Sequence, residues 1–444
     1  MDIPQGIIQV LDRLEAAGYE AYIVGGCVRD SLMGRQPQDF DIATSALPEE
    51  TMAVFADLRV IPTGLKHGTV TVIVGKEPVE ITTYRVDGDY ADGRRPDSVQ
   101  FTRSISEDIA RRDFTMNGIA YSPKRGLFDC CGGAEDIRKG RICCIGDPDT
   151  RFNEDALRIL RALRFSAVLG FEIERKTADS IRQNRALLKR VSGERILSEL
   201  EKLLCGAECG RVLRDFPQVF AGIIPELAPC IGYNQHSRFH SLTLYEHLAA
   251  AVENAPCEAG IRLAMLLHDI AKPLTQTEGE DGEWHFYAHA GRSAELADAV
   301  LSRFHAGNAL RNRVCGIIRY HDMVPENTDR FIRRRLSKHG LPMFRDIMLA
   351  HIADDSAKAD FAKQRIPLWR EIIRRAEEID MQQPCLSIKQ LAVSGRDLAA
   401  LIPPSPRTGE TLKYLLSGVL DGRFENNREE LLVQARKFLE NGGG

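Results

Sequence analysis

Residues 22–44 constrain this chain more than any other stretch. Their sequence is YIVGGCVRDSLMGRQPQDFDIAT, which predicts a strand over 21–24, a glycine pair, a short helix and a second strand. Gly25 and Gly26 lack side chains at a point where the backbone has to approach another group closely. Arg29 follows near the predicted helix start, where backbone amides and the helix dipole favour a phosphate. The stretch therefore predicts a phosphate-binding turn between two strands.

Asp39 and Asp41 stand two residues apart on the second predicted strand. Residues i and i+2 of a strand face the same side, roughly 6–7 Å apart. Such a pair can hold Mg²⁺, which takes oxygen ligands and bridges to substrate phosphates. Asp39 and Asp41 are therefore candidate Mg²⁺ ligands and catalytic carboxylates, and two solvated carboxylates on a strand are the alternative that such a pair more often represents.

Apolar, β-branched segments follow the two aspartates. Residues 69–74 and 79–84 flank a turn signal, GKEP, and predict a hairpin beside the strand that carries Asp39 and Asp41. Glu80 on this hairpin is a candidate third catalytic carboxylate. A surface glutamate is an equally good interpretation, because strand register cannot be fixed from the sequence.

Two segments between 86 and 117 have a composition typical of a substrate-handling region. Residues 86–98 are rich in Gly, Asp and Arg and predict a loop that could cover a catalytic strand. The sequence RRDFTMN follows at 111–117 and begins a helix. Its arginines, including Arg112, could meet phosphates or a ribose. A solvated basic patch is the structural alternative.

The sequence EDALRILRALRF at 154–165 indicates how a base could be chosen. Charged residues recur every three positions of a predicted helix, the first three on one face: Asp155, Arg158, Arg161 and Arg164. A carboxylate only accepts hydrogen bonds and a guanidinium only donates them, so Asp155 beside Arg158 matches cytosine and adenine. Guanine and uracil would leave buried polar groups unpaired. An exposed ladder of ion pairs is the alternative.

The stretch at 22–44 resembles the nucleotidyltransferase signature of the DNA polymerase β superfamily. More narrowly, the motifs GGCVRDSLMGRQPQDFDIAT, RRDFTMN and EDALR resemble those of bacterial tRNA nucleotidyltransferases (CCA-adding enzymes) and bacterial poly(A) polymerases. The resemblance implies an α/β (α+β) polymerase-β-like head with a mixed sheet, followed by an all-α neck, body and tail. It implies CTP and ATP as substrates, tRNA as the acceptor, two Mg²⁺ ions and release of pyrophosphate.

The resemblance also assigns residues and domains. By residue, it places metal at Asp39 and Asp41, nucleotide phosphates and ribose at Gly26, Arg29 and Arg112, and base and triphosphate at Asp155, Arg158, Arg161 and Arg164. Asp147-Pro148 marks a boundary, after which the pattern becomes helical. The expected domains are a head at 1–147, a neck at 148–207, a body at 208–355 and a tRNA-binding tail at 356–444.

A second constellation occupies residues 240–354. It comprises His240, His247, His268, Asp269, His289, His321 and Asp354. A histidine followed about twenty residues later by His-Asp resembles the HD phosphohydrolase superfamily, in which imidazoles and carboxylates suit a mono- or dinuclear centre. The predicted ligands are His247, His268, Asp269 and one of His289, His321 or Asp354, with Ni²⁺ or Mn²⁺ as candidate metals. A purely structural helical body is the alternative.

Length and composition limit the number of domains, the class of protein and its compartment. The 444 residues suggest about three domains, and no apolar run approaches the roughly 20 residues of a membrane span. The amphipathic start carries acids and lacks a basic segment, unlike a signal peptide. Eleven cysteines form no CxxC pair, which favours reduced thiols in a cytoplasmic protein. At a net charge of −4, a phosphate-binding surface has to be local.

These observations favour CCA addition to tRNA over four alternatives. A bacterial poly(A) polymerase shares the head and neck motifs, and a strongly basic C-terminal extension would favour it. A partial enzyme could add only A or only CC, although an intact 86–98 loop argues mildly against CC-only addition. An HD phosphohydrolase with a degenerate head and a non-catalytic RNA-binding protein are both disfavoured by complete head motifs. The oligomeric state is not predicted.

Overall fold

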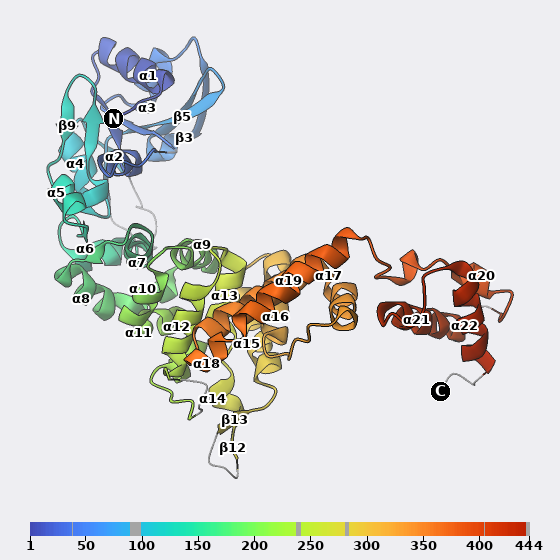
Figure 1. Ribbon diagram of the computed structural model, residues 1–444. Coiled ribbons are helices and arrows are strands. Elements are labelled where there is room, and N and C mark those ends of the chain that lie inside the picture. The colour runs from blue at the N-terminus through green and yellow to red at the C-terminus, as the bar shows by residue number, and fades with distance from the viewer. Residues whose placement is uncertain (38, 89–98, 237–240, 280–283, 404, 441–444) are drawn as a thin grey trace. The chain divides into compact units, whose positions relative to one another are not determined.

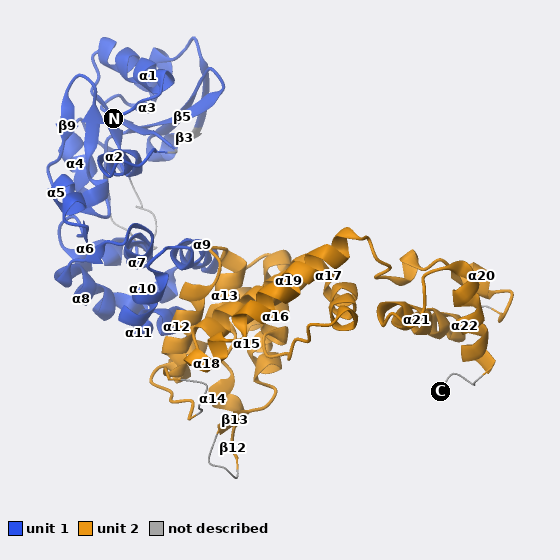
Figure 2. Ribbon diagram, viewed as in Figure 1, with its two compact units in different colours: residues 1–225 blue, residues 226–444 orange. Residues whose placement is uncertain are grey.

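The computed structural model describes residues 1–37, 39–88, 99–236, 241–279, 284–403 and 405–440. The chain divides into two compact units, Met1–Pro225 and Glu226–Gly444, coloured blue and orange in Figure 2. Within the described ranges, no helix is both long enough and apolar enough to cross a membrane.

A mixed sheet organises the start of the first unit (Figure 1). In its described residues the sheet has seven strands in the order β3-β4-β5-β2-β1-β8-β9, with β2 and β5 parallel and the other neighbours antiparallel. The strands are β1 (Ala21–Val24), β2 (Asp41–Thr44), β3 (Arg59–Gly64), β4 (Thr69–Val74), β5 (Glu77–Thr83), β8 (Ala120–Ser122) and β9 (Gly126–Phe128). The mixed sheet confirms the predicted head fold.

The sheet confirms the predicted hairpin and corrects the position of one aspartate. β4 and β5 pair antiparallel, and β5 lies beside β2 as expected. The expectation that Asp39 shares a strand with Asp41 is wrong, because β2 begins at Asp41. The partner strand ends opposite that residue: Val24 pairs with Asp41, and Gly25 then turns the chain away into the next helix. Asp39 therefore has no neighbouring strand on that side.

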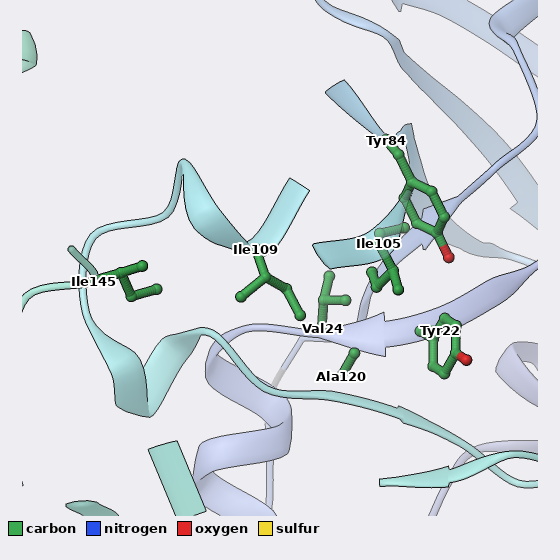
Figure 3. Close-up of a cluster of buried hydrophobic side chains, with 8 residues drawn as sticks. Tyr22, Val24, Tyr84, Ile105, Ile109, Ala120 and Ile145 are labelled. Atoms are coloured by element: carbon green, nitrogen blue, oxygen red, sulfur yellow. The ribbon is translucent and has the colours of Figure 1, made fainter. Parts of the chain in front are cut away.

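Helices and short strands complete this region. They are α1 (Gln5–Ala16), α2 (Gly26–Leu32), α3 (Pro48–Val54), η1 (Leu65–His67), β6 (Arg85–Asp87), β7 (Val99–Phe101), α4 (Ile105–Ala110), η2 (Thr115–Asn117) and α5 (Gly133–Arg138). A buried cluster joins α4 to the sheet, with Ile105 and Ile109 packed on Tyr22 and Val24 of β1 (Figure 3). The cluster fixes β1, and with it the glycine turn. Most of the predicted covering loop, residues 89–98, lies outside the described residues.

The rest of the first unit is mostly helical. Its elements are β10 (Arg141–Ile142), α6 (Pro148–Glu154), α7 (Leu157–Leu169), β11 (Glu172–Ile173), α8 (Arg175–Asn184), η3 (Arg185–Arg190), α9 (Gly193–Leu204), α10 (Cys209–Asp215) and α11 (Pro217–Ile223). The expected continuous helix over 154–165 is wrong, because Asp155 is extended (φ −140°, ψ 103°) and separates α6 from α7. Its carboxylate accepts a hydrogen bond from the Leu157 amide (3.1 Å), a local bond that competes with helix formation.

The second unit is almost entirely helical. Its elements are η4 (Pro225–Cys230), which begins at the boundary, α12 (Leu244–Asn254), α13 (Ala259–Leu267), α14 (Lys272–Thr275), β12 (Gln276–Glu278), β13 (Trp284–Phe286), α15 (His289–Arg303), α16 (Asn308–Tyr320), α17 (Asp329–Ser356), α18 (Asp360–Lys363), α19 (Ile366–Met381), η5 (Ile388–Gln390), α20 (Gly395–Leu398), α21 (Pro406–Leu420) and α22 (Arg428–Glu440). The expectation of a helical remainder holds for most of the described residues after the head; the exceptions among them are β11, which pairs with β10 of the head, and the pair β12–β13. Strands of two or three residues are too short to leave an alternating pattern in the sequence.

The cysteines form no disulfide within the described residues, and two of them are exposed, Cys130 in the first unit and Cys257 in the second. The others are half-buried or buried. Burial raises the pKa of the Cys27 thiol to about 11, and burial together with Cys130 raises that of Cys131 to about 12. These thiols therefore stay protonated at neutral pH.

Candidate nucleotide site and candidate metal centre

A cavity of about 510 Å³ lies in the first unit. Its walls come from the glycine turn, the start of β2, the segment at 111–117 and helices α7 and α9. Seven arginines and three aspartates line it: Arg29, Arg111, Arg112, Arg158, Arg161, Arg164, Arg195, Asp41, Asp113 and Asp155. The excess of guanidinium groups suits a polyanionic ligand such as a triphosphate.

The glycine turn brings two arginines to the backbone. Gly25 has φ 81°, a conformation that favours glycine. A Cβ atom on Gly25 would lie 3.4 Å from Arg112 Nη1, and one on Gly26 would lie 3.5 Å from Arg29 Nη2. The structure thus gathers Gly26, Arg29 and Arg112 on one wall of the cavity.

Asp113 connects opposite sides of this cavity. Arg161 donates to its Oδ2 through Nε (2.9 Å) and Nη2 (2.6 Å). Asn117 donates to its Oδ1 (3.0 Å) and accepts from Arg29 Nη1 (2.7 Å). Burial raises the pKa of Asp113, but Arg161 and Asn117 outweigh it, so the pKa lies below its usual value. An ionised Asp113 therefore holds Arg161 directly and Arg29 through Asn117.

Asp108 holds a second pair of arginines. It is buried in α4 and accepts from Arg111 Nε (3.0 Å) and Nη2 (2.7 Å) and from Arg112 Nη2 (3.0 Å). Burial raises the pKa of Asp108, and Arg112 and Arg111 more than reverse this, so the net shift is downward. The carboxylate is therefore charged at neutral pH and orients both guanidinium groups.

The ring of Phe165 lies against the guanidinium groups of three arginines that line the cavity. The Cζ atoms of Arg164, Arg29 and Arg161 lie 4.2, 5.1 and 5.5 Å from the centre of its ring. Arg164 Nε also pairs with the buried Glu199 Oε2 of α9 at 2.7 Å. Cations over an aromatic face are attracted by its quadrupole, so the ring restricts all three arginines.

Asp155 and Arg158 both line the cavity, but they do not form the predicted adjacent pair. Asp155 Oδ2 accepts from Arg195 Nη2 at 2.8 Å. Arg158 is buried and donates to Glu154 and to the Arg111 carbonyl (2.9 Å). The predicted shared helix face is therefore wrong for Asp155, because the break between α6 and α7 turns it toward α9. Sequence analysis missed Arg195, whose position on α9 gives no local signal.

The three predicted carboxylates occupy neighbouring strands and the loop before them. All three carboxylates are exposed, but only Asp41 is among the residues that line the cavity. Ile42 pairs with Ile81, so Asp41 and Glu80 stand one residue earlier on adjacent parallel strands. Burial raises the pKa of Asp41; Arg112 lowers it and Asp39 raises it again, with a net upward shift. A bound cation would relieve this repulsion between carboxylates.

The second unit contains a buried group of imidazoles and carboxylates. His247 comes from α12, His268 and Asp269 follow α13, and Asp354 lies on α17. His247 Nε2 lies 3.1 Å from Asp354 Oδ1, and His268 Nε2 lies 3.2 Å from Asp269 Oδ2. The two Nε2 atoms are 3.3 Å apart. These four residues have the ligand types and spacing of a transition-metal site.

His289 and His321 complete the group. Their Nε2 atoms lie 3.2 and 3.3 Å from Asp269 Oδ1. Burial lowers the pKa of His268, but the adjacent carboxylates outweigh it and raise the pKa to about 9. Lys272 Nζ pairs with Asp269 Oδ2 at 2.7 Å, and Lys358 pairs with Asp354. His240, the remaining predicted member, lies outside the described residues.

A cavity of about 220 Å³ opens onto one side of this group. Asp269, His289, His321 and Asp354 line it, together with His351. His351 was missed by sequence analysis; burial lowers its pKa to about 3. It precedes Asp354 by three residues on α17, a helical spacing that puts the two side chains on one face and could have signalled it.

Family models match four parts of the chain. The description "Poly A polymerase head domain" matches residues 21–143, and "Probable RNA and SrmB- binding site of polymerase A" matches 170–231. "HD domain" matches 239–359, and "tRNA nucleotidyltransferase domain 2 putative" matches 364–435. The first match contains the sheet and the glycine turn.

Relatives and solved structures match nearly the full length. The CCA-adding enzyme of Geobacillus sp. (strain WCH70) is 34% identical over 429 residues, which cover 96% of this chain and 95% of that protein. The crystal structure of the Bacillus stearothermophilus CCA-adding enzyme in complex with CTP is similar, with a TM-score of 0.76, 30% identity, and coverage of 99% of this chain and 100% of the other. The Thermotoga maritima CCA-adding enzyme complexed with tRNA shares the fold, with a TM-score of 0.61, 21% identity, and coverage of 98% and 96%.

The mixed sheet and its arginine-lined cavity, joined to a helical remainder, define a polymerase-β-like nucleotidyltransferase. Within that class, the chain belongs to the family of CCA-adding enzymes. This confirms the resemblance found in the sequence.

Proposed function

We propose that the chain adds C, C and A to the 3′ end of tRNA from CTP and ATP, without a nucleic-acid template. One observation carries the proposal: a single arginine-lined cavity contains both Asp41 and the residues Asp155 and Arg158. A nucleotide bound there would meet a candidate catalytic carboxylate and a candidate base reader together. The relatives named above, one of them in complex with CTP, support the same activity.

We assign roles to the residues as follows. Asp39, Asp41 and Glu80 would hold Mg²⁺, which when bound stabilises charge on the attacking and leaving oxygens. Gly26, Arg29 and Arg112 would bind phosphates and ribose, and Arg161 and Arg164 the triphosphate. The fixed guanidinium groups position the α-phosphate and retain the pyrophosphate until bond cleavage. The tRNA 3′-hydroxyl oxygen would form a bond to the α-phosphorus as the bond from that phosphorus to the oxygen bridging to the β-phosphate breaks; the hydroxyl proton goes to solvent and pyrophosphate leaves.

Base choice would rest on Asp155 and Arg158, with one change from the sequence interpretation. One carboxylate oxygen of Asp155 accepts a hydrogen bond from Arg195, and the other accepts one from the Leu157 amide. Each oxygen has a second lone pair that can accept from an amino group. Arg195 therefore aims the acceptor, and the cytosine or adenine amino group would use the remaining lone pair.

We propose the domain limits 1–147, 148–207, 208–355 and 356–444 for head, neck, body and tail. The family-model matches, which fall at 21–143, 170–231, 239–359 and 364–435, support this order.

The test supplies purified protein, Mg²⁺, tRNA ending at the discriminator base, and each nucleotide in turn. Addition that stops after C, C and A supports the proposal. Long A tracts would show a poly(A) polymerase, and incorporation of A alone or CC alone would show a partial enzyme. The loss of addition when Mg²⁺ is chelated tests the metal requirement.

A second activity is favoured by the buried group in the second unit. We propose that His247, His268, Asp269 and Asp354 bind a transition metal, with Ni²⁺ or Mn²⁺ as candidates, and that the site hydrolyses phosphate esters. Ligands from three separate helical segments converge at a buried point, and burying imidazoles and carboxylates together is costly unless cations offset the carboxylate charge. The test is hydrolysis of a 2′,3′-cyclic nucleotide with Ni²⁺ or Mn²⁺, which should vanish in Asp269→Ala. An inactive wild-type protein would leave the group with a structural role.

A further inference from the structure

Two adjacent cysteines, Cys130 and Cys131, lie in the bend between β9 and α5 of the first unit. Their Sγ atoms are 3.7 Å apart. In a strand, successive side chains point to opposite faces, so neighbouring thiols are held apart. The bend instead brings together two groups that can form a covalent bond with each other, and neither of them lines the nucleotide cavity.

The two thiols differ in exposure. Cys130 is exposed, whereas Cys131 is half-buried and packs against the buried cluster that joins α4 to the sheet (Figure 3). A small disulfide in solution therefore reaches the sulfur of Cys130 first. Cys131 is placed to react next, because its sulfur already lies in contact with the sulfur that has been modified.

We propose that Cys130 and Cys131 form a reversible disulfide with each other when the chain meets a disulfide oxidant, and that this bond weakens nucleotide binding. Cys130 loses its proton to solvent and attacks one sulfur of the oxidant RSSR, which gives a mixed disulfide and releases RS⁻. The sulfur of Cys131 then attacks the sulfur of Cys130, releases the second RS⁻ and gives up its own proton. Two thiols of the protein are thus oxidised, and one disulfide is reduced to two thiols.

The adjacency of the two cysteines makes this bond a reversible one. A disulfide usually joins residues whose Cα atoms are roughly 4.4–6.8 Å apart, whereas neighbouring Cα atoms across a trans peptide are about 3.8 Å apart. Closing the ring therefore distorts the peptide between residues 130 and 131. Strained disulfides are readily reduced, so the bond suits a modification that is made and removed rather than a permanent cross-link.

Asp129 connects the bend to the start of α5. Its Oδ1 accepts hydrogen bonds from the amides of Cys131 (3.3 Å) and Gly133 (2.9 Å), and its Oδ2 accepts from the Ala134 amide (2.9 Å). Gly132 lies between these amides and has φ 73°, which favours glycine. A distortion of the peptide between the two cysteines moves the Cys131 amide, and Asp129 transmits this movement to the first turn of α5.

The start of α5 packs tightly against the segment that orders the arginines of the nucleotide site. A Cβ atom on Gly133 would overlap the Thr115 carbonyl oxygen. Thr115 Oγ1 also donates to Asp136 Oδ2 of α5 at 2.6 Å. Two residues further along, Asn117 Oδ1 accepts from Arg29 Nη1 at 2.7 Å. A shift of α5 therefore reaches the hydrogen bond that holds Arg29 in the nucleotide cavity.

The test treats the reduced full-length chain with oxidised glutathione and then blocks the remaining thiols with iodoacetamide. The tryptic peptide 126–138 contains both cysteines and no others. We expect it to lose two hydrogen atoms and to escape alkylation. KM for CTP should rise by roughly fivefold, as when one hydrogen bond to a charged group is weakened, and dithiothreitol should restore it. Only this kinetic readout rests on the nucleotide addition proposed above; the mass of the peptide decides the disulfide independently.

Two variants separate this pair from the other thiols. Cys130→Ser should keep the KM of the reduced chain and lose its sensitivity to the oxidant. Cys257→Ser, which changes an exposed thiol of the second unit, should remain sensitive. A peptide 126–138 that stays fully alkylated, or that carries glutathione alone, would overturn the disulfide. A disulfide that forms without a change in KM, or a Cys130→Ser variant that stays sensitive, would overturn its link to the nucleotide site.

Discussion

The two candidate sites of this chain are built with opposite charges. In the first unit the protein supplies the cations: seven arginines line a cavity with only three aspartates. In the second unit it supplies imidazoles and carboxylates, and Lys272 and Lys358 pair with two of the carboxylates. Under the activity proposed above, a bound metal would add further positive charge there. One site is prepared for an anion and the other for a cation.

This difference in charge determines how ligand binding at each site depends on pH. Guanidinium groups stay charged at any pH that proteins tolerate, so the first site keeps its charge. Imidazoles have to lose a proton before they bind metal. Protonation of these imidazoles opposes metal binding, so metal affinity at this site should increase as the pH rises. Substitutions should therefore affect one site and spare the other.

The largest expected effect comes from Asp41→Ala. Removing a metal-binding carboxylate should lower the rate of nucleotide addition by about 10³-fold or more, while tRNA binding persists. The measurement is single-turnover incorporation of C, with tRNA binding measured by filter retention. Hydrolysis of 2′,3′-cyclic nucleotide should be unchanged.

The matched control for Asp41→Ala is Asp12→Ala, which removes an exposed carboxylate that pairs with Lys124 (2.8 Å). It should leave both activities intact. If Asp41→Ala retained full incorporation, the metal assignment at β2 would be refuted.

Asp155→Ala should have the next largest effect, on selectivity. Without this acceptor, discrimination of CTP and ATP against GTP and UTP should fall by about 10²-fold, because the group that accepts from the cytosine or adenine amino group is lost. The measurement is kcat/KM for each of the four nucleotides. Unchanged ratios would place base choice elsewhere, and the control Asp179→Ala on α8 should keep the wild-type ratios.

Much of the first site could be predicted from the sequence because its motifs are local. The glycine turn, Arg29 and the 69–84 hairpin each depend on neighbours close in the chain, and the structure has them as expected. The conformation of Asp155 could not be predicted from neighbours in the sequence. Its three-residue spacing to Arg158 predicts one helix, but a side-chain bond to the Leu157 amide and an ion pair with Arg195, forty positions away, break it.

The metal centre illustrates the same limit at longer range. Residue types and order predicted His247, His268 and Asp269, yet the sequence left open which further ligand joins them. The choice depends on how α15, α16 and α17 pack, and this packing brings in His289, His321 and Asp354 together. Helix packing angles follow from many side chains at once and leave no local pattern.

Asp108→Asn should destabilise the first unit by about 2 kcal/mol at pH 7, because the three charge-assisted hydrogen bonds from two arginines are weakened. The pKa of Asp108 is lowered in the folded state, so its stabilising effect is full above the unfolded pKa of about 3.9 and is lost as pH falls through the folded pKa. The difference from wild type should therefore stay constant from pH 7 to pH 5 and shrink below about pH 4.

The positions of the two tryptophans allow the loss of stability in Asp108→Asn to be assigned to the first unit. Both of its tryptophans, Trp284 and Trp369, lie in the second unit. Urea unfolding followed by tryptophan fluorescence should be unchanged in Asp108→Asn, whereas unfolding followed by far-ultraviolet circular dichroism should show an earlier phase. A shift of both signals would mean that the two units do not unfold independently.

Phe165→Leu should have the smallest effect. Loss of the aromatic face under Arg29, Arg161 and Arg164 should raise KM for CTP and ATP equally, by roughly fivefold, with kcat nearly unchanged. Phe165→Trp keeps an aromatic face and should restore most of the affinity. A fall in kcat without a change in KM, or equal loss in the tryptophan variant, would assign the ring a packing role only.

The cysteines have a practical consequence for studying the two units. The exposed thiols are Cys130 in one unit and Cys257 in the other, while burial keeps Cys27, Cys131 and other thiols protonated and slow to react. Brief maleimide labelling at neutral pH should therefore attach one reporter to each unit without any engineered residue. The natural chain already carries the donor and acceptor positions for measuring, by energy transfer, whether the units move against each other as each nucleotide is added.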